Sequence, residues 1–342
     1  MNLALIAGGL ALGVLFGALL QRSRLCMVAG VSNWLLIRDT RQLQAFLAAA
    51  AVAMLGAGLL EAGGWVALAD AGYRAARFDW LGAAAGGLMF GIGATLAGGC
   101  AARTLVRSAE GHLGSLITLA SFALAAAVTH YGVLAAPRLW LMERSAVALA
   151  AGDSSLAVLI GAPVWLPGLA LAMLAAGVVI RPGRGGRHPG MIAAGALAGA
   201  LVAAAWWVSG DLAQDPFAPH PPSSFTVTGP LARGVMIAVG GTTAAWDFGL
   251  ALVAGLALGA LASALAGRQF RWVAPPGERV AGHLVGGLCM GVGGTVAGGC
   301  NIGQGLTGLS TASVTSITAA AAMVLGVAAG LAILRRREAR AG

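Results

Sequence analysis

Apolar stretches long enough to form membrane-spanning helices alternate along the chain with short polar stretches. A helix needs about 20 apolar residues to cross the hydrocarbon core of a bilayer. The stretches that approach or reach this length are residues 3–20, 43–68, 81–100, 113–134, 166–180, 191–208, 248–266 and 315–334, and a shorter apolar run covers 146–159. The pattern predicts an all-α fold, that of a polytopic protein embedded in a lipid bilayer.

One apolar stretch, residues 25–37, is too short to cross a bilayer and predicts a re-entrant or interfacial helix with Cys26 at its start. Basic residues such as Arg24 and Arg38 flank it at both ends, and the positive-inside rule places both flanks in the cytoplasm. The amino terminus is then periplasmic. The basic tail, residues 335–340, is predicted to be cytoplasmic.

A glycine-rich segment of 15 residues occurs twice in the chain. Residues 86–100 read GGLMFGIGATLAGGC and residues 286–300 read GGLCMGVGGTVAGGC, so ten of the 15 positions are identical at a spacing of 200 residues. Glycine pairs four residues apart, at 13 and 17 and at 255 and 259, extend the duplication. We predict two repeats, residues 1–135 and 231–342, joined by connecting spans and a polar loop at 136–230 into one membrane domain. By analogy with other repeated transporters, we expect the repeats to be inverted.

Each copy of the segment ends in Gly-Gly-Cys, and the double glycine is expected to break the helix. A broken helix at membrane depth must bury its free backbone groups in protein or line a cavity. If a short helix follows each break, the half-helices meet near the midplane, and their free N–H groups favour an anion there. Arg103 could add positive charge on one side. The residues predicted to contact a substrate at the breaks are Gly99, Cys100, Gly299, Cys300, Asn301 and Gln304.

The composition excludes a soluble protein. Hydrophobic residues make up 58% of the chain and charged residues 10%, with 54 glycines and a mean hydropathy of +0.85. The net charge of +9 comes from arginines in short segments between apolar stretches, including a connector at 181–189. This distribution fits the positive-inside rule better than a nucleic-acid-binding face.

The four cysteines occur without a CxxC motif or a cysteine-dense segment, which argues against a disulfide framework and a zinc ribbon. A thiol is a weak hydrogen-bond donor, so its use at a helix break indicates a soft ligand such as thiosulfate, sulfide or a selenium analogue. Because a thiolate would repel an anion, we expect neutral thiols. Cys289 stands where the first copy has Met89, and we predict a packing role for it.

Four motifs of the chain resemble the YeeE/YedE family of sulfur-compound transporters. They are QRSRLC at 21–26, GGC at 98–100, WDFG at 246–249 and GGCNIGQGLTGLS at 298–310. The resemblance implies thiosulfate uptake across the bacterial inner membrane by an hourglass-shaped protein. It also implies that Cys26, Cys100 and Cys300 relay the ion by hydrogen bonds, and that a TusA-like sulfurtransferase is a partner on the cytoplasmic side.

Two other classes of membrane protein could use these cysteines. A thiol–disulfide oxidoreductase would need cysteines that oxidise and reduce in turn, and no CxxC motif supports one. A transporter of metal ions or another soft ion lacks carboxylates and imidazoles near the glycine-rich segments, and His112 and His283 have no metal-ligand spacing. Selenium compounds stay open as an alternative substrate. We predict a transporter without enzymatic activity, cofactor or bound metal.

Overall fold

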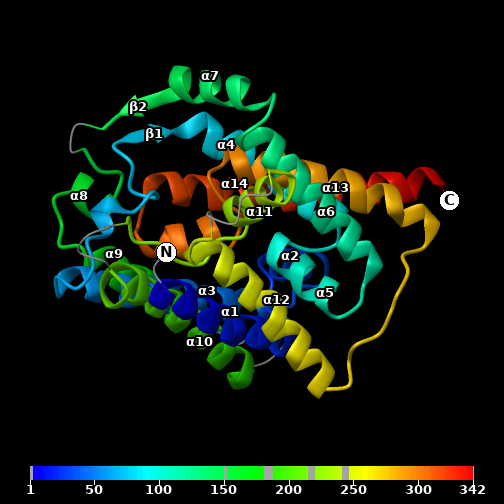
Figure 1. Ribbon diagram of the computed structural model, residues 1–342, viewed down its shortest axis with the longest axis horizontal. Helices are drawn as coiled ribbons and strands as arrows, with labels where there is room; N and C mark the ends of the chain where they lie inside the picture. The colour runs from blue at the N-terminus through cyan, green and yellow to red at the C-terminus, as the bar shows by residue number, and fades with distance from the viewer. Residues whose placement is uncertain (1–2, 150–151, 181–187, 215–219, 241–245, 342) are drawn as a thin grey trace.

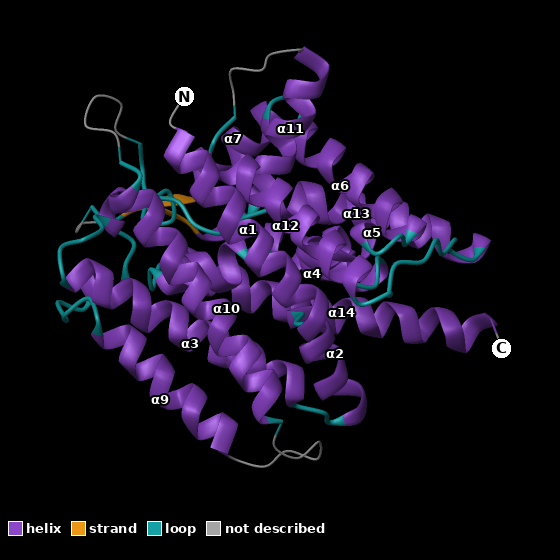
Figure 2. Cartoon of the chain, turned by 60° about the horizontal axis from the view of Figure 1, so that its bottom comes forward, coloured by secondary structure: helices purple, strands orange, loops and turns teal. Residues whose placement is uncertain are grey.

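Helices make up most of the computed structural model (Figures 1 and 2). The structure describes residues 3–149, 152–180, 188–214, 220–240 and 246–341. The α-helices are α1 (Leu3–Ser23), α2 (Met27–Ile37), α3 (Arg41–Ala62), α4 (Trp80–Leu96), α5 (Ala101–Ala109), α6 (Leu113–His130), α7 (Ala135–Ser145), α8 (Leu156–Leu159), α9 (Leu166–Ile180), α10 (Pro189–Trp207), α11 (Thr228–Gly240), α12 (Phe248–Ala266), α13 (Gly277–Val296) and α14 (Val314–Ala341). The other elements are the 3-10 turn η1 (Leu68–Asp70), the π-helices η2 (Val208–Leu212) and η4 (Gly303–Gly308), and the strands β1 (Arg77–Asp79) and β2 (Ala146–Ala148).

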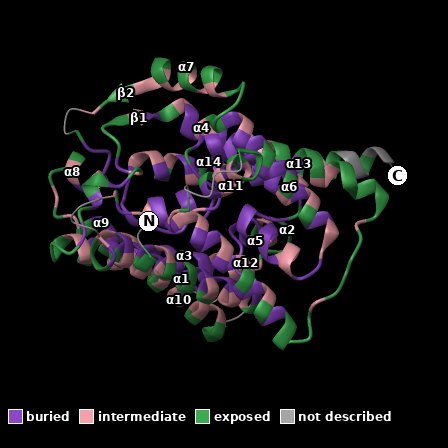
Figure 3. Cartoon of the chain, viewed as in Figure 1, coloured by how far each residue is buried: buried purple, intermediate pink, exposed green. Residues whose placement is uncertain are grey.

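Among the described residues, seven helical segments are long and apolar enough to cross a membrane, which confirms the all-α, polytopic fold. They are Leu3–Ile37, Arg41–Ala62, Trp80–Ala109, Leu113–His130, Pro189–Leu212, Phe248–Ala266 and Val314–Arg336. Buried residues gather where these helices meet, and exposed residues lie on the rim of the bundle (Figure 3). The core is therefore formed between helices, as expected when their outer faces contact lipid.

The apolar run at 146–159 does not form a continuous helix. It begins as strand β2, which pairs antiparallel with β1, and it ends as the short helix α8. Asp153 interrupts the run, because its carboxylate accepts hydrogen bonds from the side chain of Arg74. Most of the basic connector predicted at 181–189 lies outside the described residues, which resume at 188.

The two glycine-rich helices, α4 and α13, cross at their glycines and run in opposite directions. A Cβ atom on Gly93 would lie 2.7 Å from the carbonyl oxygen of Gly286, and one on Gly293 would lie 2.7 Å from that of Gly86. The late residues of each helix thus face the early residues of the other, and the contacts are reciprocal. Glycine is required at this crossing because any side chain would meet backbone. The repeats themselves stay a prediction.

The other main helix pairs run parallel and also use small residues. Helix α12 lies along α1, where Gly13 faces Leu252, and α10 lies along α3, where Gly195 faces Ala45. Helix α4 pairs with α14, and α13 pairs with α6, in the same sense. The glycine pair of α1 therefore contacts α12, and the matching glycine pair of α12 contacts α1. Helix α10 packs along α3 as α1 packs along α12, so the contacts of α10 correspond to those of α1.

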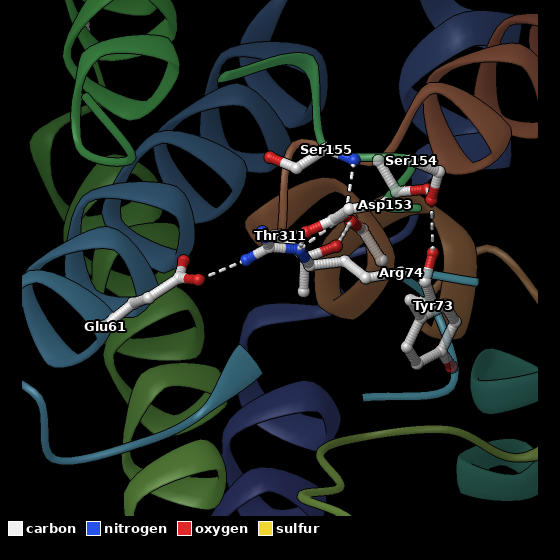
Figure 4. A network of polar contacts seen from close by, with 9 residues as sticks. Glu61, Tyr73, Arg74, Asp153, Ser154, Ser155 and Thr311 are labelled. Atoms are coloured by element: carbon white, nitrogen blue, oxygen red, sulfur yellow. Dashed lines mark hydrogen bonds and ion pairs between the residues drawn. The ribbon is translucent and has the colours of Figure 1, made fainter. Parts of the chain in front are cut away.

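Arg74 ties the connection between β2 and α8 to the end of α3 (Figure 4). Its side chain is 2% exposed, donates from Nε to Asp153 Oδ1 at 2.9 Å, and forms an ion pair with Glu61. The hydroxyl of Ser154 donates to the carbonyl oxygen of Tyr73 at 3.3 Å. This network fixes the backbone around Tyr73.

Replacing Arg74 by methionine is expected to destabilise the fold by about 3 kcal/mol, because two largely buried carboxylates would lose their cation. The loss should appear as a lower midpoint of unfolding in detergent. Arg77→Met is the matched control, since Arg77 is exposed three residues further along, and it should cost less than about 0.5 kcal/mol. Equal midpoints for R74M and R77M would show that the network contributes nothing to stability.

Candidate functional site

Three of the four cysteines lie immediately before helical segments. Cys26 is the residue before α2 and Cys100 is the residue before α5, and both have an extended backbone. Cys300 precedes the turn into η4, and its sulfur accepts a hydrogen bond from the backbone N–H of Gly303 at 3.5 Å. The predicted position of Cys26 at the start of a short helix is confirmed. Each thiol thus lies beside the free N–H groups of a helix start, which favour negative charge.

The double glycine before Cys100 and before Cys300 ends the preceding helix, as the sequence predicts. Gly98 and Gly298 both have φ of +75°, a left-handed conformation that glycine adopts without strain. The N–H of Gly99 donates to the carbonyl oxygen of Ala94 at 2.9 Å, and the N–H of Gly299 donates to that of Gly294 at 2.7 Å. Both breaks therefore have the same backbone geometry.

Cys26 and Cys100 are in direct contact. Their Sγ atoms are 3.6 Å apart, and the two residues are 4% and 2% exposed. Cys300 is completely buried, and η4 just after it approaches α2, since a Cβ atom on Gly305 would lie 3.8 Å from Sδ of Met27, the residue after Cys26. A sulfur–sulfur hydrogen bond requires a proton on at least one thiol. The structure thus brings two of the predicted path cysteines together and places the third in their neighbourhood.

Two cavities flank these cysteines. The first, called the Arg24 cavity, has a volume of about 370 Å³, and Arg24, Cys26, Gly98 and Arg103 are among its lining residues. The second, called the Arg138 cavity, has a volume of about 310 Å³, and its lining includes Tyr73, Arg77, Arg138, Gly298 and Gln304. One cavity lies at the end of α4 and the other at the end of α13. Because these helices are antiparallel, the cavities lie on opposite sides of their crossing.

Each cavity is lined by an arginine with a buried side-chain nitrogen that has no hydrogen-bond partner among the described residues. These nitrogens are Nη1 of Arg103 and Nε of Arg138. Arg103 Nη1 lies 3.8 Å from Oε1 of Glu110, which is too far for a hydrogen bond. A buried donor without an acceptor costs about 1–3 kcal/mol. An anion that came within hydrogen-bond distance of either nitrogen would remove this cost.

The other predicted site residues differ in what they can offer. Gln304 donates to a backbone carbonyl at 2.6 Å and accepts from the hydroxyl of Ser316 at 2.6 Å, so its amide already has partners in the protein. Asn301 is 1% exposed, and its Oδ1 has no partner within the described ranges. Gly99 lines the Arg24 cavity, whereas Gly299 packs against Gln304. Asn301 therefore has unused hydrogen-bonding capacity, and Gln304 holds the second break in place.

Sequence reasoning missed two residues of the Arg138 cavity. Tyr73 follows the polar connection after α3, and its hydroxyl would lie 3.0 Å from a Cβ atom on Gly303. Burial raises the pKa of Tyr73, so its hydroxyl keeps a proton to donate. Arg138 comes from α7, on the rim of the molecule (Figure 1). Neither residue belongs to a repeated segment or a motif, so the sequence carries no signal for them.

The surroundings of Cys289 differ from those of the other three cysteines. It is half-buried on α13, where its Cβ faces Gly93 of α4. All four cysteines are free thiols. In the part of the chain that the structure describes, no three His, Cys, Asp or Glu side chains come together as a metal site would need.

A family model described as sulphur transport matches residues 22–329. The chain belongs to this sulphur transport family. The family is the YeeE/YedE family that the motifs resemble, and the matched residues include Cys26, Cys100 and Cys300.

Two curated relatives of this sulphur transport family member carry the name thiosulfate transporter TsuA. The relative from Escherichia coli (strain K12) is 29% identical over 325 residues, which cover 89% of this chain and 87% of the relative. The relative from Spirochaeta thermophila is 28% identical over 330 residues, which cover 93% of this chain and 96% of the relative. With its seven apolar helical segments, this family member is a multi-pass membrane protein, and its relatives are transporters rather than enzymes.

Proposed function

We propose that this chain carries thiosulfate, or a closely related sulfur anion, across the bacterial inner membrane. The observation that carries the proposal is the contact between Cys26 and Cys100 at the Arg24 cavity. The anion would enter the Arg138 cavity, pass Cys300, Cys100 and Cys26 in turn, and leave through the Arg24 cavity. The names of the two curated relatives support the choice of thiosulfate over a selenium compound.

Neutral thiols suit a path along which an anion must bind and then leave. A thiol donates only a weak hydrogen bond, and the terminal sulfur of thiosulfate is a soft, polarisable acceptor. Weak binding at several neighbouring positions permits conduction, whereas one tight site would trap the ion. With Cys26 and Cys100 3.6 Å apart, the ion can contact the next thiol before it leaves the previous one.

The orientation in the membrane follows from the arginines. Helices α1 and α12 run parallel and end near Arg22 and Arg268, and Arg22 Nε donates to Ser263 at 3.2 Å. Helix α14 runs towards the same side, because it is parallel to α4, whose end lies at the Arg24 cavity. We infer that this arginine-rich side faces the cytoplasm, which makes the amino terminus periplasmic and the carboxyl terminus cytoplasmic. A TusA-like sulfurtransferase would then receive the ion at the Arg24 cavity.

We also infer two inverted repeats. The antiparallel, reciprocal crossing of α4 and α13 supports the inversion. The parallel pairs α1 with α12 and α10 with α3 support α10 as the counterpart of α1. In this scheme the first repeat keeps its predicted range of 1–135, and the second begins near Pro189 instead of residue 231.

The experiment that tests the function is uptake of radiolabelled thiosulfate by liposomes that contain the purified protein. Uptake should exceed that of protein-free liposomes, and unlabelled thiosulfate should compete with it. Sulfate should not compete, because it lacks the terminal sulfur that the thiols would bind. Equal competition by sulfate, or uptake no higher than in empty liposomes, would disprove the proposal.

The same assay tests the Arg138 cavity. Arg138→Gln should raise the thiosulfate concentration for half-maximal uptake about tenfold, since a hydrogen bond to a charged group contributes about 1.5–3 kcal/mol. Arg144→Gln is the matched control, because Arg144 lies on the same helix and stacks on Trp140 at 4.7 Å. If R138Q and R144Q reach half-maximal uptake at the same thiosulfate concentration, binding of the anion does not depend on Arg138.

A further inference from the structure

Four basic side chains surround a smaller cavity on the arginine-rich side, separate from the cysteines. Arg107, His112, Arg279 and His283 line this cavity, which has a volume of about 150 Å³ and lies between the starts of α6 and α13. Among the described residues, none of the four forms an ion pair with a carboxylate. The two arginines therefore carry positive charge without an ion-pair partner, whereas burial lowers the pKa of both histidines.

A hydrogen-bonded backbone frame holds the cavity open. The loop before α13 pairs with the segment before α6, through Arg271 N–H to Glu110 O at 3.0 Å and Val273 N–H to Gly111 O at 3.1 Å. Leu113 N–H donates back to Val273 O at 2.9 Å. Gly111 has φ of +95°, and a Cβ atom there would collide with the backbone of Arg271. The two walls of the cavity are thus fixed to each other.

His283 reaches the cavity from α13, and Gly114 of α6 makes room for its ring. A Cβ atom on Gly114 would lie 2.6 Å from Nε2 of His283, closer than real Cβ contacts come. The Nδ1 atom of the ring lies 2.9 Å from the hydroxyl of Thr118. Burial lowers the pKa of His283, so the ring is neutral unless an anion in the cavity favours the protonated form, in which both nitrogens donate.

The charges of the cluster act on one another. Arg107 is within electrostatic reach of Arg279, His112 and His283. Glu110 offsets part of this charge, and its Oε1 lies 3.8 Å from Nη1 of Arg103. Positive charges held together without a counter-ion repel one another, and a bound anion would offset that repulsion.

We propose that this cavity binds a phosphate group, either of free inorganic phosphate or of an anionic lipid headgroup. Guanidinium and imidazole N–H groups are matched to the oxygens of a tetrahedral oxyanion. The cavity contains no thiol among its lining residues, which suits a hard oxyanion rather than thiosulfate. Its volume of about 150 Å³ has room for one such group, since a water molecule takes up about 30 Å³. Trp272 beside it is 71% exposed, as is typical of tryptophan at a membrane interface.

The test uses the full-length protein in nanodiscs. In neutral phosphatidylcholine discs, binding of inorganic phosphate is measured by calorimetry; in a second arm, retention of phosphatidylglycerol is measured by native mass spectrometry. The double variant Arg279→Gln/His283→Ala should weaken binding at least tenfold in the arm that detects it. Gly114→Ala should act in the same direction, because it displaces His283. Arg268→Gln, an exposed arginine on the same side but outside the cavity, should stay within twofold of the unmodified protein.

Binding in the first arm identifies free phosphate as the ligand, and binding in the second arm alone identifies a lipid headgroup. Absence of binding in both arms overturns the proposal, as does an equal loss in R268Q. Thiosulfate uptake by the double variant, measured after the same purified protein is placed in liposomes, should match the unmodified protein and so report that the variant is folded. The phosphate site and the transport path can therefore fail independently.

Discussion

Replacing Cys100 by alanine is expected to lower thiosulfate uptake about a hundredfold. Cys100 is buried against Cys26, and in the proposed path it lies between Cys26 and Cys300. Its loss would remove one hydrogen bond to a charged ion, and the ion would have to cross the gap without a donor, at a cost of about 2–3 kcal/mol. Uptake into liposomes, normalised to the amount of folded protein, measures the effect. Cys300→Ala should behave in the same way.

Two further variants separate the possible roles of sulfur. Cys100→Ser keeps a hydroxyl donor of similar shape, so full activity in C100S would show that softness of the sulfur is unimportant. Cys289→Ala is the matched control, since Cys289 is only half-buried and lines neither cavity of the proposed path. It should take up thiosulfate within about twofold of the unmodified protein, because a thiol-to-methyl change off the path costs little. Normal uptake by both C100A and C300A would remove the cysteine relay.

Gly93→Val is expected to prevent correct packing of the two glycine-rich helices. Three added carbon atoms would meet the backbone of α13, where even a Cβ atom would lie 2.7 Å from Gly286 O and 2.8 Å from Met290 N. Overpacking of this kind costs about 3 kcal/mol or more when neither backbone can move away. The variant should unfold at a markedly lower temperature in detergent, and much of it should elute as aggregate in size-exclusion chromatography.

Gly177→Val serves as its control. Gly177 also lies inside a helix, α9, but a Cβ atom there would meet nothing within 4 Å. Valine at this position should therefore leave the unfolding midpoint and the elution profile unchanged. If G93V and G177V were equally stable, the α4–α13 crossing would not depend on its glycines.

Local features of the site could be predicted because they depend on residues that are close in sequence. The apolar stretch 248–266 coincides with helix α12, and the double glycine before Cys100 produces the expected break. The flanking arginines separated the short helix α2 from α1, which placed Cys26 at its start. In each case, the length of an apolar stretch, a double glycine or a flanking arginine decides the structure without help from distant segments.

Features that depend on which helices become neighbours were not predictable in this way. Every long helix here is apolar on most of its surface, so periodicity does not tell which face meets which partner. The match between the glycine pairs of α1 and α12 predicted equivalent helices, and it gave no sign that these two helices pack on each other. Arg138 and Tyr73 reach the second cavity only because the Arg74 network and α7 bring residues from outside the glycine-rich segments over it.

The pairing of early with late helices bears on how the protein is made. Helix α1 packs on α12, and α4 packs on α14, which is the last helix of the chain. A ribosome adds about 5–20 residues per second, so α4 waits roughly 10–40 seconds for its partner after it leaves the ribosome. During that interval its glycine-lined face has only lipid or an insertion factor as a neighbour. A ribosome that stalls before α14 therefore leaves in the membrane a chain in which this face of α4 has no partner helix.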